Sequence, residues 1–211
     1  MHTEIQNILS RGCALAADLD ECRCEEAAAV LEQMMEANRI YQGQERNPAR
    51  LTDAVRKETA EHGQHPKAVV VCCADSRVPP EHIFGAGIGD LFVIRNAGNL
   101  MGPFDAGSVE YAVEHLHVPL VVIMGHRNCG AVASALSRGA AAGDLAAVLA
   151  EVSLAIGDAS DPAEAEERNL IRSISRLRES ELLRQFARAG KVGFASAIYD
   201  IRTGEVRFLS E

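Results

Sequence analysis

The pattern of apolar and polar residues changes about one third of the way along this chain of 211 residues. Before that point it predicts helices at residues 4–17, 25–41 and 48–62. In the third helix, Asn47 is placed to cap the start and Pro48 to take the first helical position. Continuous apolar runs rich in β-branched residues begin only after this helical segment.

Three such runs follow, and each has the composition of a strand buried on both faces of a sheet. They are K-A-V-V-V-C-C-A at 67–74, D-L-F-V-I-R-N at 90–96 and P-L-V-V-I-M-G-H at 119–126. A short helical turn at P-E-H-I-F-G and a helix at 105–116, with Asp105 as candidate cap, separate them. A further helix, N-C-G-A-V-A-S-A-L, begins directly after the third run.

The last third of the chain is helical at residues 144–189, with a break near 157–162. It closes with a strand, K-V-G-F-A-S-A-I-Y-D-I, and a short hairpin partner, G-E-V-R-F-L-S, turned at Thr203–Gly204. Strands that alternate with helices predict an α/β fold with a mostly parallel central β-sheet flanked by helices. We expect one domain, 1–211, with an N-terminal helical arm (1–63), a core with the candidate site (64–139), and a helical region with C-terminal strands at the sheet edge (140–211).

Composition narrows the possible functions. Hydrophobic residues make up 47% and charged residues 24%, as in ordinary globular domains, and the net charge of −9 argues against nucleic acid or an anionic membrane as partner. The N-terminus resembles no secretory or transit peptide, and no apolar run approaches the ~20 residues of a membrane span, so we expect a cytoplasmic protein. The six cysteines do not have the pattern of a disulfide framework.

The candidate chemistry lies where the strands end. Cys73 ends the first run and His126 the third, and ligands of parallel sheets collect at the carboxyl ends of strands. If the chain stays extended after the first run, Cys73, Asp75 and Arg77 point to one side and Cys72 points to the packing side. We therefore expect Cys72 to be a small buried hydrophobe.

A second part of the site is G-H-R-N-C-G, in which His126 and Cys129 are spaced across a strand-to-helix turn. A cysteine in the first turn of a helix has its thiolate form favoured. Two thiolates and an imidazole suit zinc, and three ligands on a rigid sheet are typical of a catalytic site with an open position. Asp75 could be a fourth ligand or could face that open position.

These motifs, C-A-D-S-R-V-P-P-E, G-D-L-F-V-I-R-N-A-G-N and G-H-R-N-C-G-A-V, closely resemble those of the β-class carbonic anhydrases. The resemblance covers residues 64–135 and resumes in the terminal Y-D-I-R-T-G-E-V. It implies one Zn²⁺ per chain, held by Cys73, His126 and Cys129, and a catalytic pair formed by Asp75 and Arg77. It further implies that the substrate is bound at Gln64, Phe92, Tyr111 and the backbone N–H of Gly130.

The activity implied by the resemblance is the reversible hydration of carbon dioxide to bicarbonate by zinc-bound hydroxide. In this scheme Arg77 keeps Asp75 ionised, so that Asp75 accepts a hydrogen bond from the hydroxide, although Asp75 can ligate zinc in a closed state. The family forms dimers at minimum, with the cleft between subunits, so a homodimer or homotetramer is expected. Some of Gln64, Phe92 and Tyr111 are then expected to come from the partner chain.

Two other functions remain open at this point. The same zinc site could hydrolyse carbonyl sulfide or carbon disulfide, or the thiolates could serve a zinc-binding or redox-sensing module without hydratase activity. Arg127 places a large cation directly after His126, and its direction is open. Cys22-x-Cys24 has no counterpart in the resemblance. A second metal site there stays open, but a chance pairing at a helix start is favoured, since only two ligands are in sight.

Overall fold

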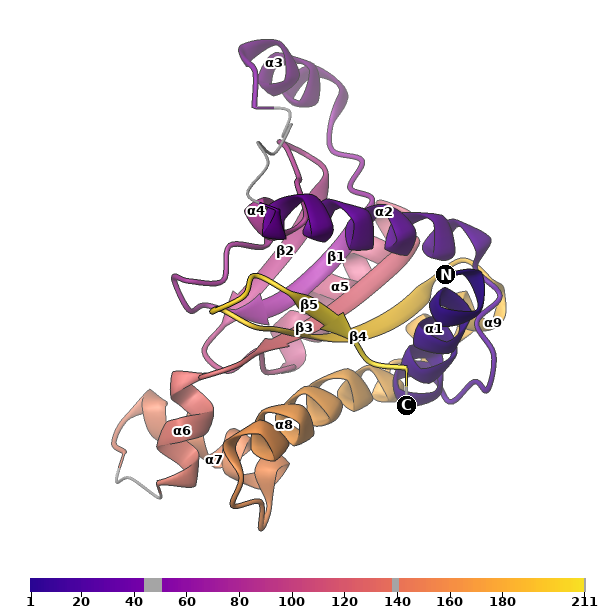
Figure 1. Ribbon diagram of the computed structural model, residues 1–211. Helices are drawn as coiled ribbons and strands as arrows, with labels where there is room; N and C mark the ends of the chain where they lie inside the picture. The colour runs from indigo at the N-terminus through magenta and orange to yellow at the C-terminus, as the bar shows by residue number, and fades with distance from the viewer. Residues whose placement is uncertain (44–50, 138–140, 211) are drawn as a thin grey trace.

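The computed structural model describes residues 1–43, 51–137 and 141–210. Its centre is a five-stranded sheet with the strand order β2-β1-β3-β4-β5 (Figure 1). The first four of these strands pair in parallel, and the short β5 runs antiparallel to β4. The strands are β1 (Ala68–Cys73), β2 (Leu91–Asn96), β3 (Leu120–His126), β4 (Gly193–Tyr199) and β5 (Val206–Phe208). The α/β fold with a mostly parallel sheet is thereby confirmed.

Helices flank this sheet on its faces and ends (Figure 1). In chain order they are α1 (His2–Ala17), α2 (Glu25–Gln42), α3 (Asp53–His62), α4 (Pro80–Ile83), α5 (Pro103–His115), α6 (Gly130–Leu136), α7 (Asp144–Ile156), α8 (Pro162–Arg176), the 3₁₀ turn η1 (Leu177–Glu179) and α9 (Glu181–Arg188). None of the helices described is long and apolar enough to cross a bilayer.

The central strands are buried along their whole length, as their continuous apolar sequences predict. Every residue of β1, β3 and β4 is buried. The prediction of equal burial for the second run is wrong, because β2 is half-buried. Among the described strands β2 pairs only with β1, so it lies at the edge of the sheet and one of its sides has no neighbouring strand.

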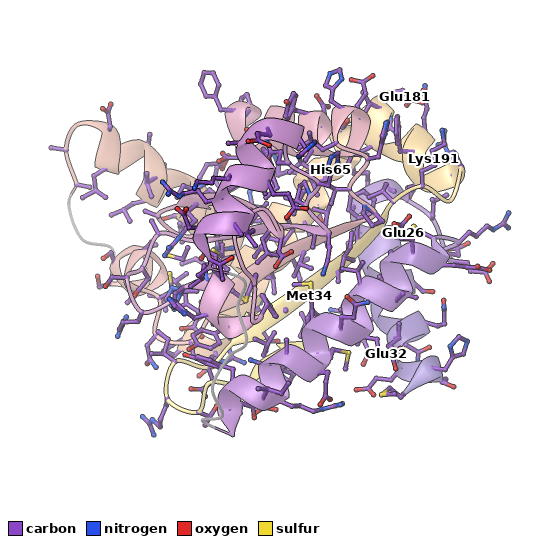
Figure 2. The ribbon with its side chains drawn as sticks, turned by 90° about the horizontal axis from the view of Figure 1, so that it is seen from above. Glu26, Glu32, Met34, His65, Glu181 and Lys191 are labelled. Carbon is purple, nitrogen blue, oxygen red and sulfur yellow. The ribbon has the colours of Figure 1, made fainter. Side chains whose placement is uncertain are left out.

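The N-terminal helices α1 and α2 contribute to the core of the same chain. Ile8, Leu9 and Leu31 are among its fully buried side chains. Met34 points from α2 toward the sheet, whereas Glu32 on the same helix is exposed (Figure 2). The helix α3, in contrast, stands away from the sheet (Figure 1).

The first helix begins at His2, two residues earlier than predicted. Three other predicted helix starts differ from the structure, each for a local reason. The helix α3 begins at Asp53, because Thr52 has extended backbone and its hydroxyl accepts the N–H of Val55 at 3.3 Å. Asn47 and Pro48 lie outside the described residues. The start of α6 is two residues later than predicted, since Asn128 has a left-handed φ of 59° that interrupts the helix.

The third difference concerns Asp105, which is not the cap residue of α5. It lies at the third helical position, and its Oδ2 accepts the N–H of Gly102, the residue before the helix, at 2.9 Å. The carboxylate thus reaches back across the first turn and satisfies an N–H group that the helix leaves unpaired.

The helix α1 approaches the backbone of β4 so closely that only glycine fits between them. A Cβ atom on Gly12 would lie 1.9 Å from the carbonyl oxygen of Phe194. We predict that Gly12→Ala lowers the free energy of unfolding by about 1–3 kcal/mol, because α1 must move off the sheet. Urea denaturation followed by circular dichroism measures this change.

Gly107 provides the matched control, since it lies in α5 with no atom within 4 Å of a Cβ added there. Gly107→Ala should stabilise the chain by about 0.5–1 kcal/mol through lower entropy of the unfolded state. If Gly12→Ala were equally stabilising, the close contact between α1 and β4 would be refuted.

Candidate metal centre

Three side chains with ligand atoms for a metal meet at the carboxyl edge of the sheet. The two Sγ atoms of Cys73 and Cys129 and a ring nitrogen of His126 all lie within 4.8 Å of one another. Cys73 is the last residue of β1, His126 is the last of β3, and Cys129 directly precedes α6. Because β1 and β3 are adjacent and parallel, residues 53 positions apart in the chain end at the same place.

The imidazole of His126 is oriented so that one nitrogen is left for a metal. Its Nδ1 lies 3.0 Å from the carbonyl oxygen of Arg127, which can only accept a hydrogen bond, so the proton lies on Nδ1. The other nitrogen, Nε2, is buried and has no hydrogen-bond partner. A buried polar atom without a partner is costly, and a metal ion between Nε2 and the two sulfurs would satisfy it.

The two cysteines are already arranged for metal binding. A hydrogen bond with Cys129 lowers the pKa of Cys73 to about 4 and raises the pKa of Cys129. The N–H of Gly98 also donates to Cys73 Sγ at 3.4 Å. One sulfur is therefore a thiolate before any metal binds, and a metal needs to displace only the proton that the pair shares.

Asp75 and Arg77 form a tight pair beside these ligands. Arg77 donates from Nε to Oδ1 at 2.9 Å and from Nη2 to Oδ2 at 2.7 Å, and its backbone N–H donates to Oδ1 at 2.9 Å. These bonds hold the pKa of Asp75 well below its usual range, so the carboxylate stays ionised. Oδ2 lies 4.0 Å from His126 Nε2, which places the carboxylate next to the ligand cluster.

The pairing does not arise from extended backbone, as the alternation of side chains assumed. The chain turns after Asp75, with the N–H of Val78 donating to the Asp75 carbonyl oxygen at 3.0 Å. This turn brings Arg77 back onto Asp75, because an aspartate side chain readily accepts the N–H two residues on. Cys72 is fully buried on the other side, as expected.

Arg95 fixes the same turn from the neighbouring strand β2. Its Nε donates to the carbonyl oxygen of Cys73 at 3.1 Å, and its Nη2 donates to that of Asp75 at 2.7 Å. The sequence analysis did not single out Arg95. Its position near the carboxyl end of the second apolar run was the available signal.

The loop after β2 closes over Cys73 and requires glycine. Gly98 has φ of 80°, in the left-handed region that side chains disfavour. Asn169 of α8 donates to the carbonyl oxygen of Gly98 at 2.8 Å and so holds the residue whose N–H faces the cysteine sulfur. Asn169 lies 71 positions from Gly98, and nothing in the local sequence points to it.

Arg127 points away from the ligands and toward α8. It donates to Glu166 at 3.1 Å, to Glu167 at 2.7 Å and to the carbonyl oxygen of Ala163 at 2.9 Å. Glu166 is itself buried, and its other oxygen accepts the N–H of Cys129 at 3.3 Å. The cation that follows His126 thus holds a carboxylate that supports the second cysteine. Only the tertiary fold could reveal Glu166, which lies 37 positions from Cys129.

Gln64, Phe92 and Tyr111 do not join this cluster within one chain. Phe92 pairs with Val69 near the start of β1, whereas Cys73 pairs with Asn96 at its end. The two pairs are four residues apart, so Phe92 lies roughly 13 Å along the sheet from the level of Cys73. The ring of Tyr111 lies 6.2 Å from that of Phe92. Gln64 precedes β1 and is exposed. Gly130, in contrast, directly follows Cys129 as the first residue of α6.

Comparison with known proteins places this cluster in a family. A family model described as carbonic anhydrase matches residues 68–206, and the chain belongs to this family. Its solved structural neighbours include β-class members, and the fold and the Cys–His–Cys cluster agree with that class.

The relatives cover the chain to different extents. Carbonic anhydrase 2 of Mycobacterium tuberculosis is 44% identical over 110 residues, which are 52% of each chain. The chain spans about half the length of this curated relative. The β-carbonic anhydrase CcaA is 26% identical with a TM-score of 0.65, covering 85% of this chain and 86% of its own. One of two tetrameric β-carbonic anhydrases of Sordaria macrospora is 25% identical, with a TM-score of 0.65. The match covers 86% of this chain and 97% of its own.

The adjacent cysteines at the end of β1 allow a direct test of the ligand set. We predict that Cys73→Ala lowers the zinc content of the purified protein to about a tenth or less, since two ligands do not hold the ion. The matched variant Cys72→Ala should keep its zinc, because Cys72 faces the core. Elemental analysis of both proteins decides the matter, and a zinc-replete Cys73→Ala protein would refute the assignment.

The contact of Glu166 with the Cys129 backbone leads to a second prediction. Glu166→Ala should weaken zinc binding by about 10–100-fold, because the loop that carries Cys129 loses its support and Arg127 loses a partner. Competition with a chromophoric chelator measures the affinity. The control Glu167→Ala removes an Arg127 partner that does not touch Cys129, and it should have a smaller effect. Equal losses in the two variants would contradict this role for Glu166.

Proposed function

We propose that this protein is a zinc enzyme that interconverts carbon dioxide and bicarbonate. The observation that carries the proposal is the unpaired, buried Nε2 of His126, which faces two cysteine sulfurs beside an ionised Asp75. Membership of the carbonic anhydrase family supports the same reaction. A closed four-ligand site, as in a structural or sensing module, would have no use for the arginine-bound carboxylate.

Cys73, His126 and Cys129 would hold the zinc, and their two sulfurs and one nitrogen suit its ligand preferences. When bound there, zinc supplies Lewis acidity that makes a water molecule a nucleophile near neutral pH. The chain contributes burial, since all three ligands are at most 5% exposed. Burial keeps competing water away from the reacting atoms and strengthens the electrostatic interactions among them.

Asp75 selects and orients the attacking group. Because it is ionised, its oxygens accept hydrogen bonds and cannot donate them. Asp75 therefore takes the O–H of the nucleophile, which directs the nucleophile's lone pair toward the carbon of carbon dioxide. An oxygen without a proton would meet the negative charge of the carboxylate and be repelled.

Arg77 keeps Asp75 in this role rather than in the ligand set. Both carboxylate oxygens are bound by the guanidinium in a two-point contact, the strongest geometry of this kind of pair. For Asp75 to become a fourth ligand, at least one of these bonds would have to break. This contact supports an open arrangement, in which Asp75 would stay outside the ligand set.

Three of the substrate-binding residues, Gln64, Phe92 and Tyr111, would come from a second copy of the chain. Phe92 and Tyr111 lie at the end of the sheet opposite to their own metal ligands, and Gln64 precedes that end. In a two-fold dimer the same patch of each chain can face the partner's site. One solved neighbour is described as tetrameric, which supports self-association in this family. Gln64 would then donate its amide N–H to a substrate oxygen, beside the apolar ring of Phe92.

A substitution at Asp75 separates metal binding from turnover. We predict that Asp75→Asn keeps one zinc per chain but lowers kcat/KM for carbon dioxide roughly 100-fold or more. The amide N–H can donate a hydrogen bond to the lone pair of the nucleophile that should attack carbon dioxide, which the carboxylate cannot do. Stopped-flow hydration assays on protein of measured zinc content test this.

Asp158→Asn is the matched control, because it breaks an aspartate–arginine pair on the exposed turn after α7. Its activity should equal that of the unmodified protein. An Asp75→Asn enzyme with full activity would remove the carboxylate from the mechanism.

A mixing experiment tests whether the cleft is shared. Cys73→Ala removes a ligand and Gln64→Ala removes the amide, so each variant alone should be nearly inactive. In mixed dimers of the two, one site keeps the ligands of one chain and Gln64 of the other. Refolding equal amounts together should therefore restore about a quarter of the activity. If activity did not rise above the sum of the separate variants, Gln64 would not act across the interface.

A further inference from the structure

Asn169 is a buried amide on α8 whose side chain makes its hydrogen bond outside that helix. It is 1% exposed, and its Nδ2 donates to the carbonyl oxygen of Gly98 at 2.8 Å. Its Oδ1 is buried and has no hydrogen-bond partner among the described residues. A buried polar atom without a partner lowers the stability of the folded chain. The role of Asn169 therefore depends on what its other contact holds in place at Gly98.

The loop that contains Gly98 has a backbone conformation that chains disfavour. Gly98 and Asn99 have successive left-handed φ values of 80° and 46°. This region is open to glycine but costs free energy at asparagine. Such a backbone persists only where the surrounding structure holds it, and it is found most often at functional sites.

Helices α6, α7 and α8, which lie at one edge of the sheet (Figure 1), hold this loop. A Cβ atom on Gly98 would lie 3.3 Å from Ala131 of α6 and 3.3 Å from Val152 of α7. This packing limits the position of Gly98 but does not fix the direction of its polar groups. The hydrogen bond from Asn169 fixes the Gly98 carbonyl group, and with it the orientation of the residue.

The N–H of Gly98, oriented in this way, points at a candidate metal ligand. It donates to Cys73 Sγ at 3.4 Å in a buried environment. A hydrogen bond to an ionised acceptor is stronger than one between neutral groups, and it withdraws negative charge from that acceptor. A thiolate that shares its charge with an N–H group donates less of that charge to a bound metal. The position of Gly98 thus affects the electronic character of the sulfur as well as its place.

We propose that Asn169 is a positioning residue for the Cys73 thiolate, acting through the N–H of Gly98. By holding Gly98, it sets how much charge this sulfur donates to the metal. Two thiolates make a bound ion a weaker Lewis acid than neutral ligands would, and the N–H offsets part of that effect. The inference deepens the proposed function and rests on it, because it assigns a role toward the same ion.

The first test uses the unmodified chain, with an NMR-active cadmium isotope in place of zinc. Cadmium accepts the same sulfur ligands, so a scalar coupling should connect the metal to the amide proton of Gly98 through the Cys73 sulfur. A second coupling, from the side-chain nitrogen of Asn169 to the carbonyl carbon of Gly98, should report the other hydrogen bond. If either coupling is absent in the metal-bound protein, the proposal is overturned.

The second test compares two variants of α8 with Co²⁺ in the site. Asn169→Leu keeps the approximate size of the side chain but removes the donor. Its thiolate-to-cobalt charge-transfer band should move to longer wavelength, because a sulfur without the N–H contact gives up an electron more easily. Its affinity for zinc, measured with a competing chelator, should fall about 10–100-fold.

Ser173→Ala is the matched control for this comparison. Ser173 is also buried on α8, one turn further on, and its hydroxyl donates to the backbone carbonyl oxygen of Asn169 at 3.0 Å. Its loss should leave the cobalt spectrum and the zinc affinity unchanged. The proposal is overturned if Asn169→Leu has the spectrum of the unmodified protein, or if Ser173→Ala shows the same shift. Because the two couplings need no variant, poor folding of Asn169→Leu would not protect the proposal.

These outcomes are distinguishable from failure of the proposed function. A protein that binds the metal and hydrates carbon dioxide but lacks the couplings would contradict the role of Asn169 alone. A protein that shows both couplings and the spectral shift but no hydration would contradict the proposed reaction alone. A chain that binds neither cadmium nor cobalt would contradict both.

Discussion

The adjacent, parallel pairing of β1 and β3 is the constraint on which the site depends. It ends both strands at one edge of the sheet, where the Cys73 sulfur and the His126 imidazole meet. The chain after β3 then turns through Asn128, whose left-handed backbone delays α6 and brings Cys129 back to the same point. Ligands from two segments more than fifty positions apart are thus fixed by strand register and one short turn.

A ring of hydrogen bonds then limits how these ligands can move. Arg95 donates to the carbonyl oxygens of Cys73 and Asp75. Asn169 holds Gly98, whose N–H faces the Cys73 sulfur, and Glu166 supports the backbone of Cys129. Each supporting residue comes from another element of the fold, so the geometry is set by the whole domain. Such preorganisation matters for catalysis, because a ligand set that need not rearrange spends no binding energy on ordering itself.

Much of this could be predicted from the sequence, because its signals are local. Continuous β-branched runs identified the strands, and the spacing of His126 and Cys129 identified the candidate ligands. Signals that depend on tertiary neighbours were missed: the edge position of β2 and the support from Glu166. The prediction of extended backbone after Cys73 was wrong, because the chain makes a tight turn at Asp75 and this turn brings Arg77 onto the Asp75 carboxylate.

The most direct measurement of the central claim is stopped-flow carbon dioxide hydration across neutral and alkaline pH, on protein whose zinc has been counted. With Asp75 held by Arg77, the account predicts one zinc per chain and activity that rises through a single alkaline ionisation. A steep, cooperative loss of activity below about pH 8 would mean that Asp75 closes onto the metal, contrary to the open arrangement. Zinc-replete protein without hydration at any pH would contradict the proposed function itself.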